Sequence, residues 1–209
     1  MFYRVNYENC RNLKKPMEKK MRKKFLLVLM ACFFILSFSI TSFAESSLPE
    51  EKQTILGLYV TAKQAFEKWH SDQLKVKILD VRTQAEYIFV GHTPMAINIP
   101  SQFFKTEADS KKIQPVMSLN TNFVSDVKKR FKETDTILVI CRSGSRSAAA
   151  VNLLANAGFE AIYSITDGFE GDALNVPGSY NNGKRIVNGW KNSGAPWTYK
   201  IDPELMYVP

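Results

Sequence analysis

The chain has 209 residues, 45% of them hydrophobic, which suits one globular domain with a leader but is too short for two domains of ordinary size. Its formal net charge of +8 lies mainly near the start, because residues 1–44 hold nine of the 28 Lys and Arg residues and two of the 20 Asp and Glu residues. Residues 45–209 therefore carry 19 basic and 18 acidic side chains, a net charge of +1. This balance removes the main support for nucleic-acid binding.

The first element predicted along the chain is a secretory signal. A basic stretch, residues 14–24, precedes an uncharged run, residues 25–44, that ends in small side chains. This pattern predicts cleavage between Ala44 and Glu45, and hence an exported protein, periplasmic or secreted, without stable membrane association after cleavage. Two alternatives are an uncleaved anchor, since about 20 apolar residues span a bilayer, and a lipid anchor at Cys32, which the continuing apolar run disfavours.

Cysteine content focuses attention on one residue. Cleavage would remove Cys10 and Cys32 and leave Cys141 alone, so no intrachain disulfide could form in an oxidising compartment. A lone cysteine is more often an inert buried residue than a nucleophile. Its sequence neighbours must therefore decide between the two.

Short apolar strands alternate with helices after the leader. Thr61 with Gln64, and Thr83 with Glu86, form capping boxes that predict a helix over residues 62–70 and a second helix after Thr83. Strands are predicted at VKILDV (76–81), MAINI (95–99), TILVI (136–140) and AIYSI (161–165), and a helix ending at Gly158 follows the third of these. The alternation predicts an α/β fold with a central, mainly parallel sheet and helices on both faces.

A long connection, from Ser101 to Asn122, shows little pattern. It leaves the carboxyl end of the 95–99 strand, at the sheet edge where ligands of such folds bind and where Cys141 is expected. Either it gates the site, with apolar residues that shield the sulfur and lysines that attract an anion, or it is an idle surface loop. The gating residues would be Phe103, Phe104, Ile113 and Met117, with Lys105, Lys111 and Lys112.

The sequence CRSGSRS joins the 136–140 strand to the helix that follows. Cys141 ends the strand, and the tight turn points backbone N–H groups and the positive helix end at its sulfur. Arg142 and Arg146 add positive charge, and Gly144 permits backbone angles that a side chain would resist. We therefore expect Cys141 to react as a nucleophilic thiolate at neutral pH.

Three segments together resemble a rhodanese-like domain over about residues 55–197. They are LDVRTQAEYIFVGHTPMAINIP, CRSGSRSAAAVNLLANAGFEAIYSITDGFEG and GWKNSGAPW. The resemblance implies an α/β rhodanese-like fold and a persulfide intermediate. It divides the chain into an N-terminal extension with signal peptide (1–44), a short linker (45–54), the rhodanese-like domain (55–197) and a C-terminal tail (198–209).

The resemblance also assigns roles. Cys141 is the catalytic sulfur acceptor, and the substrate cradle comprises Arg142, Ser143, Gly144, Ser145, Arg146 and Ser147. Asp80 and Arg82 match a signature acid and base near the loop, either as a structural ion pair or with a direct catalytic role, and Glu86 is expected to pair with an arginine.

Other signature positions are less regular. His92 is expected to be a structural hydrogen-bonding residue and His70 a surface residue. Met95 and Phe169 stand where glycine is frequent, and Phe169 is expected to narrow or cover the pocket. The aromatic residues near the C-terminus are expected to pack across their own domain.

The resemblance implies a sulfurtransferase that moves a sulfane sulfur from thiosulfate, or a related anionic donor, to a thiol or cyanide acceptor. No cofactor is implied, and no metal or haem site is indicated, because only two histidines exist and no second mature cysteine is available. A cysteine phosphatase is one alternative, but such enzymes place five residues between Cys and Arg, whereas four separate Cys141 from Arg146. A non-catalytic module that binds a partner or senses oxidants is the other, and the presence of Cys141 with both arginines favours activity.

Overall fold

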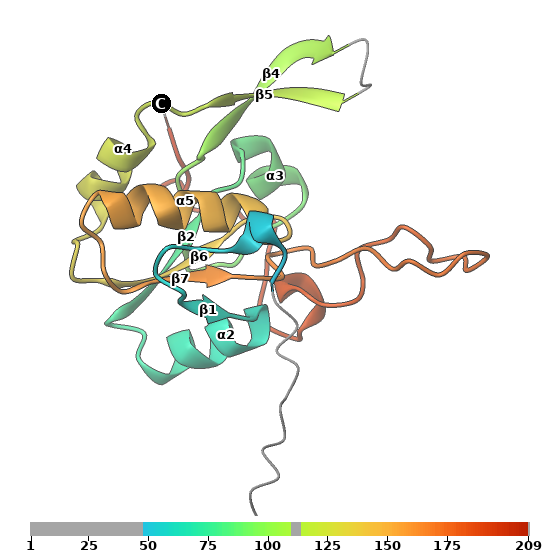
Figure 1. Cartoon of the computed structure of the whole chain (residues 1–209), viewed down its shortest axis with the longest axis horizontal. Helices are drawn as coiled ribbons and strands as arrows, with labels where there is room; N and C mark the ends of the chain where they lie inside the picture. The colour runs from blue at the N-terminus through green and yellow to red at the C-terminus, as the bar shows by residue number, and fades with distance from the viewer. Residues whose placement is uncertain (1–47, 110–113, 209) are drawn as a thin grey trace, which may run out of the picture. The chain divides into compact units, whose positions relative to one another are not determined.

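The centre of the molecule is a sheet of five short, apolar strands. The computed structural model describes residues 48–109 and 114–208. The strands are β1 (Tyr59–Val60), β2 (Val76–Asp80), β3 (Ala96–Asn98), β6 (Thr136–Ile140) and β7 (Ile162–Ile165). They lie in the order β1-β7-β6-β2-β3, and every neighbouring pair is parallel (Figure 1). The predicted α/β fold with a mainly parallel sheet is confirmed.

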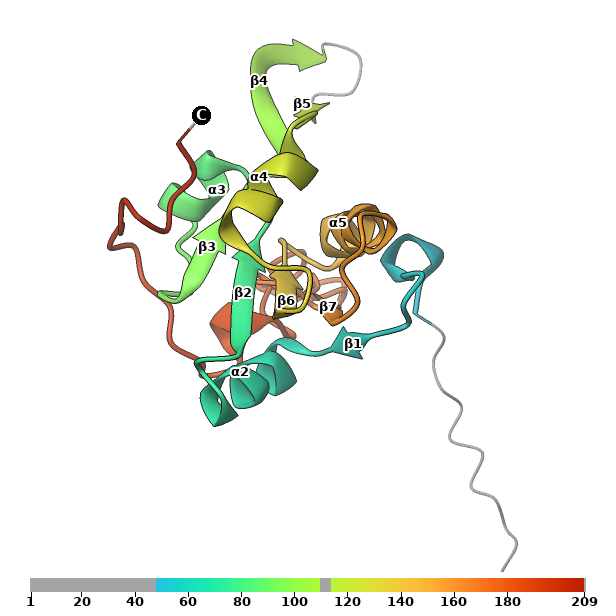
Figure 2. The same ribbon diagram turned by 90° about the vertical axis from the view of Figure 1, so that its left-hand side faces the viewer.

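Helices cover both faces of this sheet (Figure 2). One face packs against α2 (Ala62–Ser71) and the 3-10 turn η2 (Trp190–Asn192), and the other packs against α4 (Phe123–Arg130) and α5 (Ser145–Asn156). Successive strand residues alternate between these two cores, because side chains in a strand point to opposite faces. Each fully buried Leu or Ile contributes about 1.5–3 kcal/mol of burial free energy to this arrangement.

Both predicted capping boxes are confirmed. The Thr61 hydroxyl accepts a hydrogen bond from the Gln64 N–H, and the Gln64 side chain accepts one from the Thr61 N–H. Thr83 and Glu86 exchange the same pair of bonds at the start of α3 (Gln84–Phe89). These bonds satisfy N–H groups that the first turn of a helix leaves free, so they fix where α2 and α3 begin.

The long connection, expected to be a gating or surface loop, contains a β-hairpin. β4 (Gln102–Asp109) pairs antiparallel with β5 (Gln114–Leu119) as a separate two-stranded sheet, with Phe104 opposite Met117. The hairpin extends away from the five-stranded sheet in both ribbon views (Figures 1 and 2). Of the residues expected to gate the site, Lys111, Lys112 and Ile113 lie outside the described residues.

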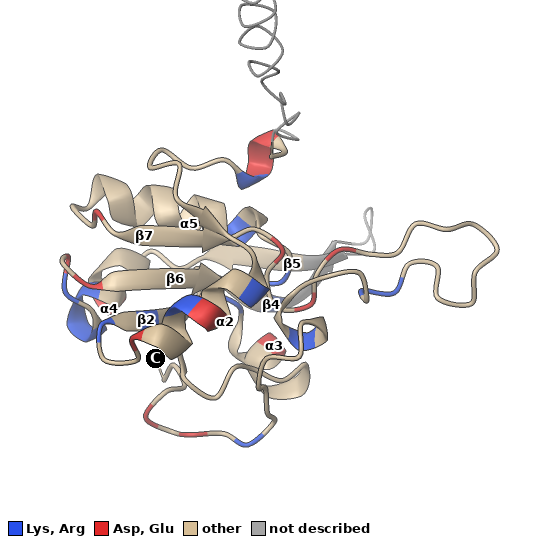
Figure 3. Cartoon of the chain, turned by 90° about the horizontal axis from the view of Figure 1, so that it is seen from below, with Lys and Arg blue, Asp and Glu red and all other residues tan. Residues whose placement is uncertain are grey.

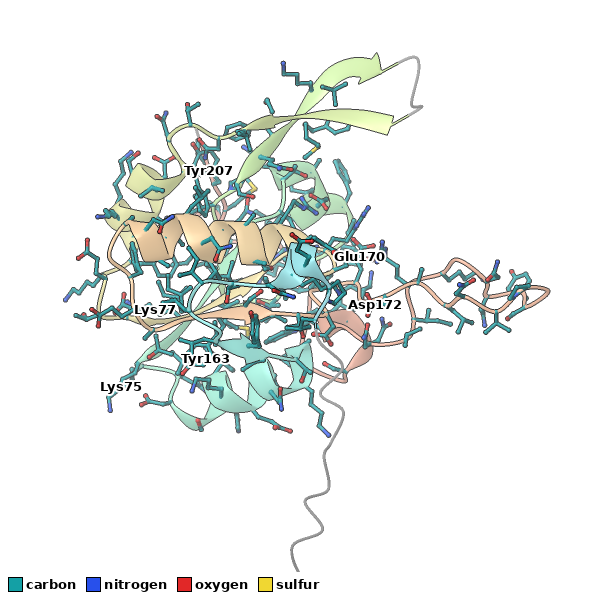
Figure 4. All side chains as sticks on the ribbon, in the orientation of Figure 1. Lys75, Lys77, Tyr163, Glu170, Asp172 and Tyr207 are labelled. Carbon is teal, nitrogen blue, oxygen red and sulfur yellow. The ribbon has the colours of Figure 1, made fainter. Side chains whose placement is uncertain are left out.

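Residues on both sides of 55–197 also contact the domain. The 3-10 turn η1 (Glu50–Lys52) packs against α5, and Lys52 Nζ lies 3.4 Å from Asp172 Oδ1; Figure 4 labels Asp172 near this turn. At the other end, the Tyr207 hydroxyl donates a 3.0 Å hydrogen bond to Asp126 of α4. The aromatic C-terminal residues therefore pack on their own domain, as expected.

Charged residues of both signs are mixed along the elements of the domain (Figure 3). This mixture agrees with the near balance of residues 45–209 in the sequence. No helix among the described residues has the length and apolar character needed to cross a membrane. The predicted signal, with its cleavage point and its alternatives, falls on residues outside the described part.

Candidate active site

Cys141 lies at the carboxyl edge of the sheet, directly after the central strand β6. Because all five strands are parallel, the residues that follow β2 and β7 lie at the same edge. The Cys141 residue is 1% exposed and its side chain packs in the core beneath α5. The sulfur is therefore shielded from bulk water at the end of the strand.

The turn after Cys141 presents N–H groups to the sulfur. The Gly144 N–H donates to Cys141 Sγ with an N···S distance of 3.1 Å. Gly144 is the N-cap of α5, so the N–H groups of Ser145, Arg146 and Ser147 have no partner within the helix. They form the positive end of the helix dipole, which stabilises negative charge nearby.

The backbone after β7 holds this turn in place. The Phe169 N–H donates to the Cys141 carbonyl at 2.7 Å, and the Glu170 N–H donates to the Arg142 carbonyl at 3.0 Å. Gly144 has φ of +108°, and a Cβ there would overlap the carbonyl oxygen of Thr166. Glycine therefore satisfies both the backbone angle and the close approach of the two loops.

An ion pair anchors the far end of the turn. Arg146 donates from Nη1 to Glu86 Oε2 at 2.7 Å and from Nη2 to Glu86 Oε1 at 2.5 Å. Their side chains are 19% and 22% exposed. Burial alone would raise the pKa of Glu86, but the hydrogen bonds and charge of Arg146, with the bonds from Thr83, lower this pKa to about 2. Glu86 thus has the arginine partner that the sequence predicts.

Asp80 and Arg82 form a second pair, entirely buried, at the end of β2. Their closest atoms, Arg82 Nη2 and Asp80 Oδ2, are 2.6 Å apart, and both side chains are 0% exposed. Arg82 also donates to the Gly91 carbonyl at 2.9 Å and lies 4.1 Å from the centre of the Phe169 ring. This geometry favours the structural alternative, because the pair contacts protein on every side.

Phe169 does not narrow the pocket, so that expectation is wrong. The residue is 0% exposed, and its ring packs between Arg82 and the edge of Trp197 in the core beneath α2. Its backbone N–H donates to the Cys141 carbonyl, so the backbone lies at the sheet edge while the ring lies in the core on the α2 side. His92 is buried, stacked on Tyr87 with ring centres 3.7 Å apart, and has the structural position expected, while His70 is exposed.

A cavity of about 620 Å³ opens beside the turn. It brings together Arg142 and Arg146, residues from both ends of α3, and one face of the hairpin. Its walls are formed by Thr83, Ala85, Glu86, Phe89, Val90, Gln102, Phe104, Met117, Arg142 and Arg146. Among the expected gating residues, Phe104 and Met117 therefore lie at the site. Phe103 packs instead against Tyr207, with ring centres 5.9 Å apart.

Among the wall residues, the sequence did not indicate Ala85, Phe89, Val90 and Gln102. Phe89 and Val90 end an amphipathic helix and read as ordinary core residues, and no local signal separates them from the core. Among the described residues, no three His, Cys, Asp or Glu side chains are grouped as a metal site would need.

Cys141 begins a turn directly after the central parallel strand, and a comparison with known families agrees with this arrangement. The family model of the Rhodanese-like domain matches residues 62–174, more than half of the chain. The protein belongs to this family. The rhodanese-like domain here is 34% identical over 122 residues to "Uncharacterized protein RP600" of Rickettsia prowazekii, covering 58% of this chain and 82% of that protein.

The name of a second relative states an enzymatic activity. "Thiosulfate sulfurtransferase 16, chloroplastic" of Arabidopsis thaliana is 36% identical over 99 residues, which cover 47% of this chain and 75% of that protein. Among solved structures, that of Rv0390 from M. tuberculosis is 26% identical with a TM-score of 0.53, covering 68% of this chain and 96% of the other. These likenesses support the rhodanese fold over the described domain.

Proposed function

We propose that this rhodanese-like protein is a sulfurtransferase that carries sulfur on Cys141. The observation that carries the proposal is the hydrogen bond from the Gly144 N–H to Cys141 Sγ at the N-terminus of α5. Three further N–H groups follow it without a partner in the helix. Fixed donors of this kind stabilise an anionic sulfur without rearranging during the reaction. The name of the Arabidopsis relative supports the same class of activity.

The reaction proceeds in two displacements. The Cys141 thiolate attacks the outer sulfur of thiosulfate, the S–S bond of the donor breaks, and sulfite leaves with the electron pair. The thiolate of an acceptor, or cyanide, then attacks the outer sulfur of the persulfide. The S–S bond of the persulfide breaks, the Cys141 thiolate returns, and the acceptor leaves as a persulfide or as thiocyanate. The electrons balance without a cofactor.

Two residues of the turn have roles that their positions support. Arg142 is exposed at the cavity and makes no ion pair among the described residues, so its charge is available to attract an anionic donor. The Ser147 hydroxyl is buried and has no hydrogen-bond partner in the described part of the chain. An unpaired buried hydroxyl is costly, and the outer sulfur of a persulfide would give it an acceptor.

The phosphatase alternative is disfavoured by the pairing of Arg146. Both terminal nitrogens of its guanidinium donate to Glu86, so this fork is not free to hold phosphate oxygens. The turn is also one residue shorter than a cysteine phosphatase loop, which suits a single terminal sulfur. A purely binding module would have no need of the N–H groups around Cys141.

Intact-mass measurement of the protein after thiosulfate treatment tests the proposal. We expect a gain of one sulfur atom that is lost when a thiol is added, with peptide mapping placing it on Cys141. Cys141→Ser should gain none and show no thiosulfate turnover, because a serine hydroxyl cannot form a persulfide. Ala149→Ser is the control, because Ala149 is an exposed residue of α5 whose replacement leaves the thiol untouched, and this variant should still take up sulfur. Sulfur uptake by Cys141→Ser would reject the mechanism.

We also propose that the protein is exported and cleaved between Ala44 and Glu45. The basic stretch, the apolar run and the small residues before Glu45 support this location. N-terminal sequencing of protein from the producing cell should read from Glu45. A sequence that still begins upstream of the apolar run would favour the anchor instead.

A further inference from the structure

The cavity beside the turn that follows Cys141 is larger and more apolar than the small inorganic substrates need. Arg142 and Arg146 connect it to the turn, while Cys141 itself lies buried next to Arg142. Its volume of about 620 Å³ is of the size that holds drug-sized organic ligands, whereas thiosulfate and cyanide contain only a few atoms. Five of its wall residues are apolar: Ala85, Phe89, Val90, Phe104 and Met117. Inorganic anions gain no binding free energy from apolar walls, so the presence of these apolar residues requires another explanation.

The two faces of the hairpin have different contacts: one lines the cavity and the other packs against the C-terminal segment. Phe104 and Met117 are directly paired across β4 and β5, so their side chains share one face, and both line the cavity. The neighbouring residue Phe103 points to the other face, where it contacts Tyr207 of the C-terminal segment. The Tyr207 contact lies on the face opposite Phe104, so the Phe104 face is the one that lines the cavity.

This wall exposes much apolar surface. Phe89 is 79% exposed, Phe104 is 54% exposed and Met117 is 37% exposed. These side chains come from α3 and from both hairpin strands, yet they converge on one cavity. A concentration of exposed apolar side chains around a cavity is typical of a binding site rather than of ordinary surface.

Charge distinguishes the two ends of the cavity. Glu86 and Arg146 neutralise one another, which leaves Arg142 as the uncompensated charge on the described wall. The wall at Arg142 therefore favours an anionic group, and the wall at the hairpin favours an apolar body. A ligand that fits both carries a carboxylate near its sulfur and an apolar group beyond.

We propose that α3 and the β4–β5 hairpin form a subsite for the sulfur acceptor. This acceptor is an organic thiol with a nearby carboxylate and an apolar group at least as large as one amino-acid side chain. The inference rests on the proposed sulfurtransferase function. The acceptor thiolate attacks the outer sulfur of the Cys141 persulfide, the S–S bond breaks, and the acceptor leaves as a persulfide. Phe104 and Met117 then determine which acceptor is used.

Acceptor kinetics with the full-length protein test this subsite. With thiosulfate as donor, kcat/KM is measured for the dipeptide Cys-Phe, for the polar dipeptide Cys-Ser, and for cyanide. We expect Cys-Phe to be preferred over Cys-Ser by about tenfold, the effect of burying one aromatic ring partially. Phe104→Ser and Met117→Ser should each reduce that ratio. Leu119→Ser is the matched control, because Leu119 is an exposed apolar residue of β5 that does not line the cavity, and it should keep the ratio.

Binding separates the subsite from the chemistry. The S-methyl derivative of Cys-Phe cannot accept sulfur, and calorimetry should show that it binds the unmodified protein and binds Phe104→Ser more weakly. If the protein does not transfer sulfur from thiosulfate to cyanide but still binds the S-methyl derivative, the proposed sulfur transfer is rejected and the subsite is supported. Equal kcat/KM for the two dipeptides together with no binding of the S-methyl derivative would overturn the subsite. A longer apolar peptide with an internal cysteine, preferred over Cys-Phe, would identify a polypeptide as the source of the thiol.

Discussion

Glu86 joins the first turn of α3 to the turn after Cys141, and its replacement by Gln tests this connection. Gln keeps the size of the side chain and an oxygen that can accept the Thr83 bonds. It removes the negative charge and leaves Arg146, which is 19% exposed, without a counter-charge. We expect Glu86→Gln to fold but to be clearly less stable, because removing one partner exposes the desolvation cost of the other.

The magnitude follows from the pKa of Glu86. Folding lowers this pKa from 4.5 to about 2, because Arg146 and Thr83 outweigh the effect of burial. The difference corresponds to about 3 kcal/mol of free energy of unfolding, since each tenfold change in proton affinity is worth about 1.4 kcal/mol. The Glu86 side chain is 22% exposed, so solvent screens the pair only partly.

The sign of the pH dependence is determined by the direction of the pKa change. A carboxyl with a lowered pKa in the folded protein stabilises it above pH 4.5, and that contribution is lost as the pH falls from about 4.5 toward about 2. The stability difference between wild type and Glu86→Gln should therefore be largest at neutral pH and should shrink on acidification.

Urea unfolding followed by tryptophan fluorescence, at neutral pH and in steps to about pH 3, measures this difference. Glu160→Gln is the matched control, because Glu160 is exposed and forms no ion pair among the described residues; it should change stability by less than about 0.5 kcal/mol. A Glu86→Gln effect below about 1 kcal/mol at neutral pH, or one that does not vary with pH, would refute the argument.

Two further predictions concern the turn itself. Gly144→Ala should destabilise the domain by several kcal/mol, a drop in melting temperature of roughly 5 °C or more, because its Cβ would overlap the Thr166 carbonyl at a φ that disfavours side chains; thermal unfolding that matches wild type would contradict this. Arg142→Gln should lower kcat/KM for thiosulfate by about tenfold at low salt and flatten its dependence on salt, because it removes an exposed charge at the cavity. A turnover series from low to high ionic strength checks it, and an unchanged salt dependence would argue against the role of Arg142.

Local sequence signals predicted much of the main domain. The capping boxes at Thr61 and Thr83 involve residues three positions apart, so the chain itself shows where α2 and α3 begin. The strand over residues 136–140 is a short β-branched run, and the structure places it at those residues. Such signals succeed because the interactions that define these elements are made between neighbours in sequence.

The hairpin could not be predicted in the same way. Its strands carry mixed polar and apolar residues and pair only with each other, and the pairing of Phe104 with Met117 joins residues 13 positions apart, beyond the reach of a local pattern such as a capping box. Helix α4 was also missed, since it is short and its N-cap residue, Asn122, makes no side-chain cap bond. Elements that are stabilised by non-local contacts leave little trace in local pattern.

The fate of Phe169 shows the same limit at the site. Its position after β7 predicted that it lies near Cys141, and its backbone does, but its ring packs against Arg82 and Trp197, which are distant in sequence. Sequence order gave the neighbourhood of the residue. Only the structure gives the side to which the side chain points.

The turn after Cys141 also bears on whether the domain is catalytic. Gly144 occupies a backbone region that other residues avoid, and the Ser147 hydroxyl is buried without a partner, a condition that costs about 1–3 kcal/mol. A module that used the rhodanese fold only to bind a partner would be more stable with an ordinary turn and an alanine at that position. Features that lower stability persist where the chemistry of a site needs them. Both lie within six residues of the cysteine, and a turn shaped to hold an anionic sulfur would account for them, which supports the proposed sulfur transfer over a binding role.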